Sequence, residues 1–181
     1  MNIILYGVPG SGKTTLARTL AKKFKLRHIA ADKFRTLAQK GKIVSKAPFH
    51  FLSTTEAYQG IGKRTKKNII AGLLSVRKAL HPTIAAHIKK QRGGFVLEAA
   101  FLDPRQFLKT GDVILLAPSA KDHERQFFIH RKKDAFHKAQ FRNARIIEGF
   151  LVAEAKRLGV PVISAPPRPP FHRPRPRSLP L

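Results

Sequence analysis

Apolar residues recur along this chain in two spacings, and segments of the two kinds alternate. Short continuous apolar runs, typical of strands buried in a parallel sheet, occupy residues 2–6, 95–99 and 112–117. Two weaker runs, 27–31 and 160–163, predict further strands of the same sheet. Between these runs, apolar residues recur three and four positions apart, which is the spacing of amphipathic helices. The alternation predicts an α/β fold in which helices cover both faces of a parallel sheet of about five strands.

The predicted helices are separated by glycine, proline and polar residues. Pro82 is expected to end one helix and to open the next, because proline disrupts a helix interior but fits the first helical turn. Residues 41–64 contain Pro48, Gly60 and Gly62, so they are predicted to be irregular. The helices are predicted at residues 15–24, 32–39, 65–80, 82–91, 119–133 and 135–158.

A phosphate-binding motif lies between the first predicted strand and the first predicted helix. Gly7 to Thr14 reads G-V-P-G-S-G-K-T and matches the pattern G-x-x-x-x-G-K-[ST], whose backbone N–H groups surround an anion. We expect this loop to bind ATP, with Lys13 neutralising charge on the transferred group and the Thr14 hydroxyl ligating Mg²⁺. Residues 41–64 are expected to cover this site. The expected phosphate contacts come from Gly10, Ser11, Gly12, Lys13, Thr14 and Thr15.

Two carboxylates are predicted to lie at the carboxyl ends of strands, where ligands of open α/β sheets bind. Asp32 follows the second strand and lies three residues before Arg35, so the two share one helix face. Asp32 is expected to orient or deprotonate an acceptor hydroxyl and Arg35 to hold an acceptor anion; the alternative is that Asp32 only caps its helix. Glu98 ends an apolar strand and is expected at the metal's water shell or at the acceptor, with a buried salt bridge as the alternative.

Basic residues are frequent in the two late helices. Arg131 lies on the first of these helices, and Lys138, Arg142 and Arg145 lie on one stripe of the second. A helical lid over residues 119–140 is therefore expected, with Arg131 as its catalytic cation and Arg145 as a second ligand of the acceptor. His123, His130 and His137 are seven residues apart, a spacing that predicts no metal site.

Charge and composition limit the function classes. The chain has 36 Lys and Arg against 10 Asp and Glu, a net charge of +26, which attracts anions from nucleotides to RNA. Adaptation to heat explains this charge poorly, because hyperthermophile surfaces gain Glu together with Lys. The absence of Cys excludes disulfides and thiolate metal sites. No apolar run reaches membrane-spanning length, and a strand starts at residue 2, so a cytoplasmic protein without a signal peptide is expected.

The last residues, 165–181, differ in composition from the rest. They hold seven of the 13 prolines and four arginines, which predicts an extended, flexible tail after a domain of residues 1–164. A solvated tail and an arm that binds nucleic acid both stay open.

Residues Met1 to Arg35 resemble the P-loop kinases that phosphorylate small hydroxyl acceptors or polynucleotide ends, through the loop and the later Asp-x-x-Arg. The longer stretch 1–163 is similar to the archaeal 2-phosphoglycerate kinase family. This resemblance implies a three-layer P-loop NTPase fold that uses ATP and Mg²⁺. The segments that carry it are Ser53–Tyr58, Ile70–Gly72, Val96–Glu98, Phe101–Pro104, His123 with Phe127, Phe141 with Arg145, Phe150–Val152 and Gly159–Ile163.

The sequence therefore predicts an ATP-dependent kinase that phosphorylates a hydroxyl of a small anionic metabolite, and the resemblance implies 2-phosphoglycerate. Two alternatives stay open. The acceptor could be the 5′-hydroxyl of a polynucleotide, which suits the net charge and the Asp-x-x-Arg pair. The chain could also bind RNA without catalysis, with the loop controlling its conformation. The acceptor, the base of the nucleotide and the oligomeric state are left open.

Overall fold

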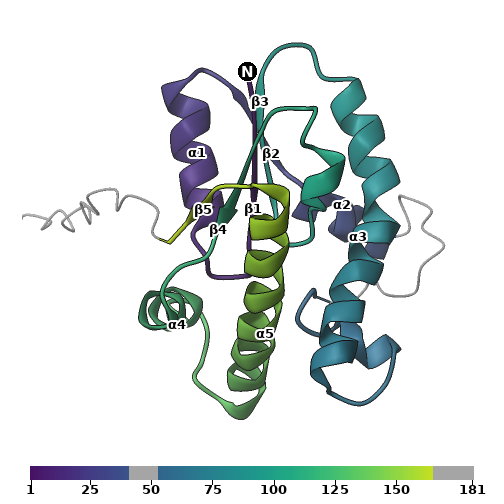
Figure 1. Cartoon of the computed structure of the whole chain (residues 1–181), viewed down its shortest axis with the longest axis vertical. Coiled ribbons are helices and arrows are strands. Elements are labelled where there is room, and N and C mark those ends of the chain that lie inside the picture. The colour runs from purple at the N-terminus through teal and green to yellow at the C-terminus, as the bar shows by residue number, and fades with distance from the viewer. Residues whose placement is uncertain (41–52, 165–181) are drawn as a thin grey trace, which may run out of the picture.

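The computed structural model describes residues 1–40 and 53–164, and it arranges five parallel strands in one sheet (Figure 1). The strand order is β2-β3-β1-β4-β5, so β1 occupies the centre, with Ile4 paired between Leu97 of β3 and Val113 of β4. This arrangement confirms the predicted parallel α/β fold. The strands are β1 Asn2–Tyr6, β2 Arg27–Ala30, β3 Phe95–Ala99, β4 Asp112–Leu116 and β5 Val162–Ile163.

Helices cover both faces of this sheet (Figure 1). Side chains of β1 alternate between the faces, as a pleated strand requires. Ile3 and Leu5 pack with Leu16 and Ala17 of the first helix, whereas Ile4 belongs to the larger cluster formed with the two long helices. The helices are α1 Lys13–Lys23, α2 Asp32–Gln39, α3 Lys66–Lys89, α4 Ala120–Phe128 and α5 Ala135–Leu158, with 3₁₀ turns η2 Ala57–Gly60 and η3 Pro104–Gln106.

The prediction that Pro82 separates two helices is wrong, because α3 continues through this residue. Proline removes one helical hydrogen bond and crowds the preceding turn. Leu80 and Ile84, on either side of Pro82, are both buried in the larger core cluster. Their burial in the core cluster that also contains Ile4 and Leu97 of the sheet keeps the helix continuous. The free energy of this burial outweighs the low helix propensity of proline.

Two other boundaries differ from those predicted. The helix expected at 119–133 ends at Phe128, because residues 129–133 are mainly exposed and basic and offer no apolar stripe to bury. Of the irregular segment 41–64, residues 53–64 contain the turn η2, while 41–52 lie outside the described residues. The predicted tail 165–181 also lies outside them. Within the parts of the chain that are described, no helix combines the length and the apolar character that a membrane span requires.

A buried ion pair joins α3 to α5. Arg77 donates from both terminal nitrogens to Glu154, at 3.0 Å to Oε1 and 2.9 Å to Oε2. The two side chains are only 3% and 5% exposed. The surrounding protein therefore shields both charges from solvent.

We expect Glu154→Ala to lower the free energy of unfolding by about 3–5 kcal/mol, because it leaves the Arg77 guanidinium buried without a counter-charge. Urea unfolding at neutral pH measures this change. The double variant Arg77→Met with Glu154→Leu is the control and is expected to recover most of the loss. A loss below about 1 kcal/mol in Glu154→Ala would show that water reaches the guanidinium and would contradict this account.

Candidate active site

The phosphate loop connects the carboxyl end of β1 to the amino end of α1. Gly12 adopts a left-handed conformation, with φ of 86°, directly before the first residue of α1. Gly10 also has a positive φ, 83°, and a Cβ on it would lie 3.0 Å from the Cα of Phe127 in α4. The loop thus requires glycine at both positions, and its backbone N–H groups are at a helix amino terminus, where anions bind.

Lys13 is the first residue of α1 and is only 7% exposed. Its Nζ donates a hydrogen bond to the Val8 carbonyl oxygen at 3.0 Å, so the side chain folds back over the loop. Burial lowers the pKa of Lys13, while the carboxylates of Glu98 and Asp32 act in the opposite direction. A phosphate anion in the loop would stabilise the charged ammonium, which is the arrangement that phosphoryl transfer needs.

Thr14 and Glu98 meet beside the loop. The Thr14 hydroxyl donates to Glu98 Oε1 at 3.1 Å, and His28 Nε2 lies 3.6 Å from the same oxygen. Glu98 is 2% exposed, and its Oε2 is buried without a hydrogen-bond partner among the described residues. The parallel register that pairs Leu5 of β1 with Glu98 brings this carboxylate to the loop.

These donors fit Mg²⁺. The Thr14 hydroxyl and the Glu98 carboxylate, one of whose oxygens is unpartnered, are hard oxygen ligands of the kind that Mg²⁺ prefers. Across residues 1–40 and 53–164 there is no cluster of three or more His, Cys, Asp and Glu side chains that could hold a metal alone. Thr14 and Glu98 would therefore hold the ion from one side and leave its other positions to water and nucleotide phosphates, as Mg²⁺ sites in phosphoryl-transfer proteins usually do.

A cavity of about 400 Å³ lies next to the loop. Most of the residues predicted for donor and acceptor binding line it, including Lys13, Thr14, Asp32, Arg35 and Arg131. They come from the loop, from α2 and from the segment after α4, so the fold gathers them from three separate parts of the sequence. The complete lining is Pro9, Gly10, Lys13, Thr14, Asp32, Arg35, Ser53, Thr54, Thr55, Ala100, Phe127, Arg131 and Gln140.

Arg131 is held toward this cavity although α4 ends before it. Its NH1 group donates to the Phe127 carbonyl oxygen at 2.7 Å, and its guanidinium carbon lies 4.4 Å from the centre of the Phe127 ring. Burial lowers the pKa of Arg131, although arginine keeps its charge at neutral pH. Arg131 thus lines the same cavity as the loop residues Lys13 and Thr14.

Arg145 lies elsewhere. Its NH1 group hydrogen-bonds to a carboxylate oxygen of Glu148 and lies 3.4 Å from the Pro118 carbonyl oxygen. It is not among the residues that line the cavity. The structure therefore places Arg145 against Glu148, Pro118 and His123 and not in the wall of this cavity.

His123 contacts the phosphate loop, and the sequence reasoning gave it no role. The ring is fully buried, and Nε2 lies 2.8 Å from the Pro9 carbonyl oxygen. Burial lowers the pKa of His123 to about 4, so the ring is neutral at pH 7 and donates from Nε2 to Pro9. Its Nδ1 can then accept from Arg145 NH1, at 3.4 Å. The signal for this role is that His123 and Phe127 share the buried face of α4.

Acid is expected to destabilise the protein through His123. Because the folded pKa lies below the ordinary value of 6.5, the stability that neutral His123 provides is complete above pH 6.5 and is lost toward pH 4. The free energy of unfolding should fall by roughly 2 kcal/mol from this group between pH 7 and pH 5. Urea unfolding at both pH values measures it. In His123→Gln, the difference between the two pH values should shrink by that amount, and an unchanged difference would contradict the assignment.

The segment before η2 supplies polar groups that sequence reasoning also missed. Ser53, Thr54 and Thr55 line the cavity, and Asn143 of α5 donates to the Thr55 carbonyl oxygen at 2.8 Å. Asn143 in turn accepts from Arg64 Nε at 2.8 Å. These bonds fix the chain at Thr55, in a run of three hydroxyl-bearing residues that line the cavity. The Ser-Thr-Thr run is the sequence signal, although its long-range partner is not visible locally.

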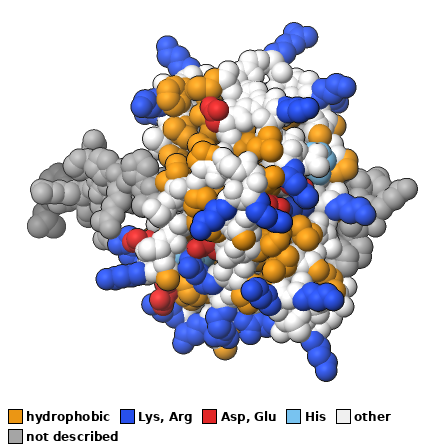
Figure 2. Space-filling view, in the orientation of Figure 1, with side chains coloured by type: hydrophobic (Ala, Val, Ile, Leu, Met, Phe, Trp, Pro, Cys, Tyr) orange, Lys and Arg blue, Asp and Glu red, His pale blue; other side chains and the backbone are white. Residues whose placement is uncertain are grey.

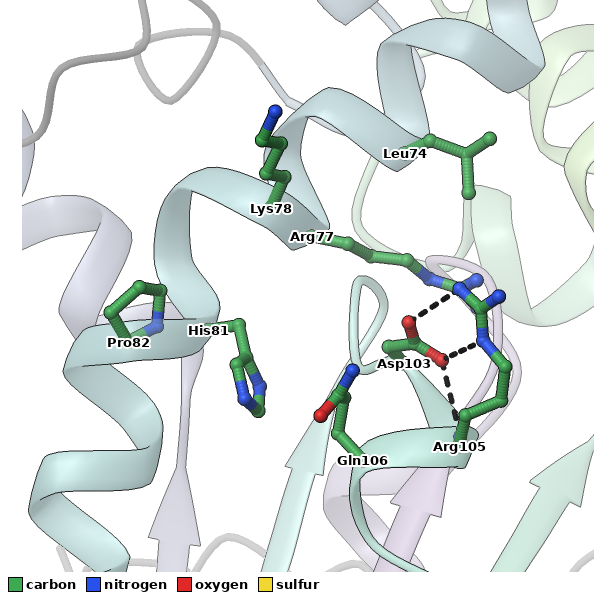
Figure 3. A pocket seen from close by; sticks show the side chains of 8 residues that line it. All are labelled: Leu74, Arg77, Lys78, His81, Pro82, Asp103, Arg105 and Gln106. Carbon is green, nitrogen blue, oxygen red and sulfur yellow. Dashed lines mark hydrogen bonds and ion pairs between the residues drawn. The ribbon is translucent and has the colours of Figure 1, made fainter.

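A second cavity, of about 380 Å³, lies between α3 and η3 (Figure 3). It is lined by Leu74, Lys78 and Pro82 among others, and its one carboxylate, Asp103, is held by Arg105 through hydrogen bonds of 2.9 and 2.7 Å. Burial alone would raise the pKa of Asp103, but the Arg105 contacts outweigh it and lower the pKa. This cavity holds none of the predicted site residues, so the cavity at the loop is the candidate active site.

A phosphate loop between β1 and α1 of a parallel sheet in the order β2-β3-β1-β4-β5 defines the α/β fold of P-loop kinases. A family profile described as an AAA domain matches residues 6–123, and the chain belongs to this family. The shikimate kinase from Acinetobacter baumannii, solved in complex with shikimate, superposes with a TM-score of 0.56 over 91% of this chain and 83% of that one. At 15% identity, this likeness shows the shared fold.

Sequence relatives carry kinase names. An adenylate kinase of Methanothrix thermoacetophila is 35% identical over 100 residues, which are 54% of this chain and 39% of the relative. A cytidylate kinase of Methanocorpusculum labreanum is 34% identical over 84 residues, 41% of this chain and 48% of the relative. The chain spans less than half the length of these curated relatives. The predicted resemblance to P-loop kinases is confirmed, while neither relative is named a 2-phosphoglycerate kinase.

Proposed function

We propose that this protein is an ATP-dependent phosphotransferase that phosphorylates a hydroxyl group of a small anionic metabolite. One observation carries the proposal: the phosphate loop, a carboxylate and two arginines from separate parts of the chain line a single cavity of about 400 Å³. Phosphoryl transfer depends on positioning and on positive charge more than on covalent chemistry, and these are the groups it requires.

In this proposal, the phosphate loop binds the phosphate donor, ATP. Backbone N–H groups from Gly10 to Thr14 bind the phosphates of ATP, and Lys13 neutralises charge on the transferred phosphoryl group. Mg²⁺, held by Thr14 and Glu98, would supply further charge neutralisation at the phosphate oxygens. The hydrogen bond from Thr14 to Glu98 and the unpartnered Glu98 Oε2 support this assignment.

The acceptor half falls to α2 and the lid segment. As the acceptor oxygen bonds to the γ-phosphorus, the bond from that phosphorus to the bridging oxygen breaks and ADP leaves. Asp32 takes the proton of the acceptor hydroxyl. Arg35, three residues further along α2, binds the anionic group of the acceptor, and Arg131 stabilises negative charge as it moves to the leaving oxygen. Arg145, bound to Glu148, keeps His123 in place instead.

The acceptor is proposed by class. 2-Phosphoglycerate is the member that the sequence resemblance implies, and the kinase names of the relatives suggest a nucleoside monophosphate as the competing acceptor. Asp32 favours a hydroxyl acceptor, because a phosphate acceptor is already ionised and needs no general base. The three hydroxyl residues at 53–55 also suit an acceptor with several hydrogen-bonding oxygens.

A panel of acceptors with γ-labelled ATP tests the proposal. It contains 2-phosphoglycerate, several other hydroxy acids with and without phosphate, AMP, CMP and an oligonucleotide with a free 5′-hydroxyl. We expect Mg²⁺-dependent transfer to a hydroxy acid. Transfer only to AMP or CMP would replace the acceptor class, and transfer to none, with intact nucleotide binding, would favour the non-catalytic alternative.

A further inference from the structure

Two basic runs of the sequence lie side by side at the end of the molecule opposite the phosphate loop. The first, Lys-Lys-Phe-Lys-Leu-Arg at 22–27, joins α1 to β2, and the second, Lys-Lys-Gln-Arg at 89–92, follows α3. The parallel pairing of β2 with β3 brings them together, since the Arg27 backbone N–H donates to the Gly94 carbonyl oxygen at 3.1 Å. Arg27 NH1 also donates to Gln91 Oε1 at 2.9 Å.

The resulting surface, which we term the basic end, has no ion pairs to its cations among the described residues. Among residues 1–40 and 53–164, no acidic side chain lies within 4.0 Å of any of its cations. The first 97 residues hold 20 Lys and Arg but only two acids, Asp32 and Glu56. Figure 2 shows Lys and Arg side chains projecting from this end, where the amino terminus and the last turns of α1 and α3 lie. The basic end comprises Lys22, Lys23, Lys25, Arg27, Lys89, Lys90 and Arg92.

The pKa values of His87 and Lys33, which lie near these cations, are lowered by burial and by the same excess of positive charge. After burial, the positive charges of Lys33, Arg27 and Lys90 lower the pKa of His87 on the last turns of α3. The pKa of Lys33 is likewise lowered, by burial and then by Arg27. Cations from α2, β2 and α3 thus repel one another here. Mutual repulsion without acids costs stability unless an anionic partner offsets it.

An exposed aromatic ring lies within the basic end. Phe24 ends α1 and is 43% exposed, and Lys23 Nζ lies 5.3 Å from the centre of its ring. Lys25 follows with φ of 52°, a left-handed conformation that favours glycine. The Leu26 N–H bonds back to the Ala21 carbonyl oxygen at 2.8 Å, which completes the turn that ends the helix. Glycine would adopt this left-handed conformation with less strain than lysine. Lys25 instead adds a positive charge to the turn.

We propose that the basic end is a binding surface for single-stranded nucleic acid. Proteins that bind single strands without strong sequence preference combine a cationic surface for the phosphates with an aromatic ring on which a base stacks. The seven cations supply the first part and Phe24 the second. The surface lies at the amino ends of the strands and the candidate active site at their carboxyl ends, so the proposal goes beyond phosphotransfer and does not depend on it.

Fluorescence anisotropy with a labelled 12-nucleotide oligouridylate, at salt concentrations from 50 to 200 mM, tests the proposal on the full chain. The triple variant Lys22→Gln, Lys23→Gln, Lys25→Gln is expected to lower the slope of log affinity against log salt by about 2, since each lost contact to a single strand removes about 0.7. The matched control, Lys63→Gln, Lys66→Gln, Lys67→Gln, removes the same charge from the other end of α3. We expect it to change the slope by less than half as much.

Two single variants separate stacking and turn geometry from charge. Phe24→Leu should weaken binding about fivefold or more with an unchanged salt slope, because only stacking is lost. Lys25→Gly should weaken binding while it retains or raises the unfolding temperature, since glycine relieves the left-handed strain. ATP affinity should stay unchanged in all these variants.

The proposal is overturned by an absence of oligouridylate binding at 50 mM salt, or by a control triple variant that loses as much affinity as the first triple variant. Tighter binding to phosphatidylserine vesicles than to oligouridylate, lost in the same variants, would instead assign the basic end to a membrane surface. An unchanged affinity in Phe24→Leu would remove the assignment to single strands.

Discussion

Replacing Lys13 by alanine is expected to lower the rate of phosphoryl transfer by about a thousandfold or more while the protein stays folded. Removal of one charge-stabilising group from a site of this kind costs about 10²–10³ in rate, and Lys13 would place its ammonium against the phosphates in a position shielded from water. Its Nζ lies over the loop, 3.0 Å from the Val8 carbonyl oxygen, where the outer phosphates would bind. Single-turnover transfer from labelled ATP to the acceptor found in the panel measures the loss.

Stability is expected to move the other way, which separates this effect from misfolding. Burial lowers the pKa of Lys13, which means that the charged ammonium destabilises the folded protein when no nucleotide is bound. Lys13→Ala should therefore keep or raise the unfolding temperature in the absence of nucleotide. Lys22→Ala, an exposed change on the same helix, is the control and should leave transfer unchanged. Full activity in Lys13→Ala would contradict the assignment of the loop.

Much of the fold could be predicted from local patterns. β3 is buried at every position and β4 is buried at Val113, Leu115 and Leu116, so their apolar runs are nearly continuous and easily recognised. The conformation of the phosphate loop can be predicted from its sequence, because the left-handed backbone at Gly10 and Gly12 favours glycine. The meeting of Thr14 with Glu98, 84 residues apart, follows from the same rule that places ligands at the carboxyl ends of parallel strands.

The failures lie where a distant contact decides the outcome. Pro82 was expected to end a helix, and the buried Leu80 and Ile84 prevent it. Arg145 is predicted at the acceptor, but its guanidinium bonds to Glu148, three residues along α5, and lies 3.4 Å from His123 Nδ1. His123 was set aside because its spacing to other histidines predicts no metal site, whereas its partner is a backbone oxygen 114 residues away. His123 bonds to a residue 114 positions away and lies beside Arg145, 22 positions away, and no local spacing in the sequence encodes these two contacts.

Asp32→Asn is expected to lower kcat by about 10²–10⁴ while the KM for ATP changes little, provided that the acceptor is a hydroxyl. Asparagine keeps the size and one hydrogen-bonding oxygen of aspartate but cannot take up the acceptor proton. Asp32 is exposed at the start of α2 and lines the cavity, so the change should leave folding intact. Steady-state kinetics with varied ATP and then varied acceptor separate the two parameters.

The size of this loss also discriminates between acceptor classes. A nucleoside monophosphate offers an ionised phosphate oxygen, whose attack releases no proton, so Asp32→Asn should then change kcat by less than about tenfold. The companion variant Arg35→Ala should raise the KM of an anionic acceptor in either class, because it removes an ionic contact that ground state and transition state share. Thr36→Ala, on the same helix but not among the residues that line the cavity, is the control. A large loss in Asp32→Asn together with a raised KM in Arg35→Ala is the combination that a hydroxyl-bearing anion requires.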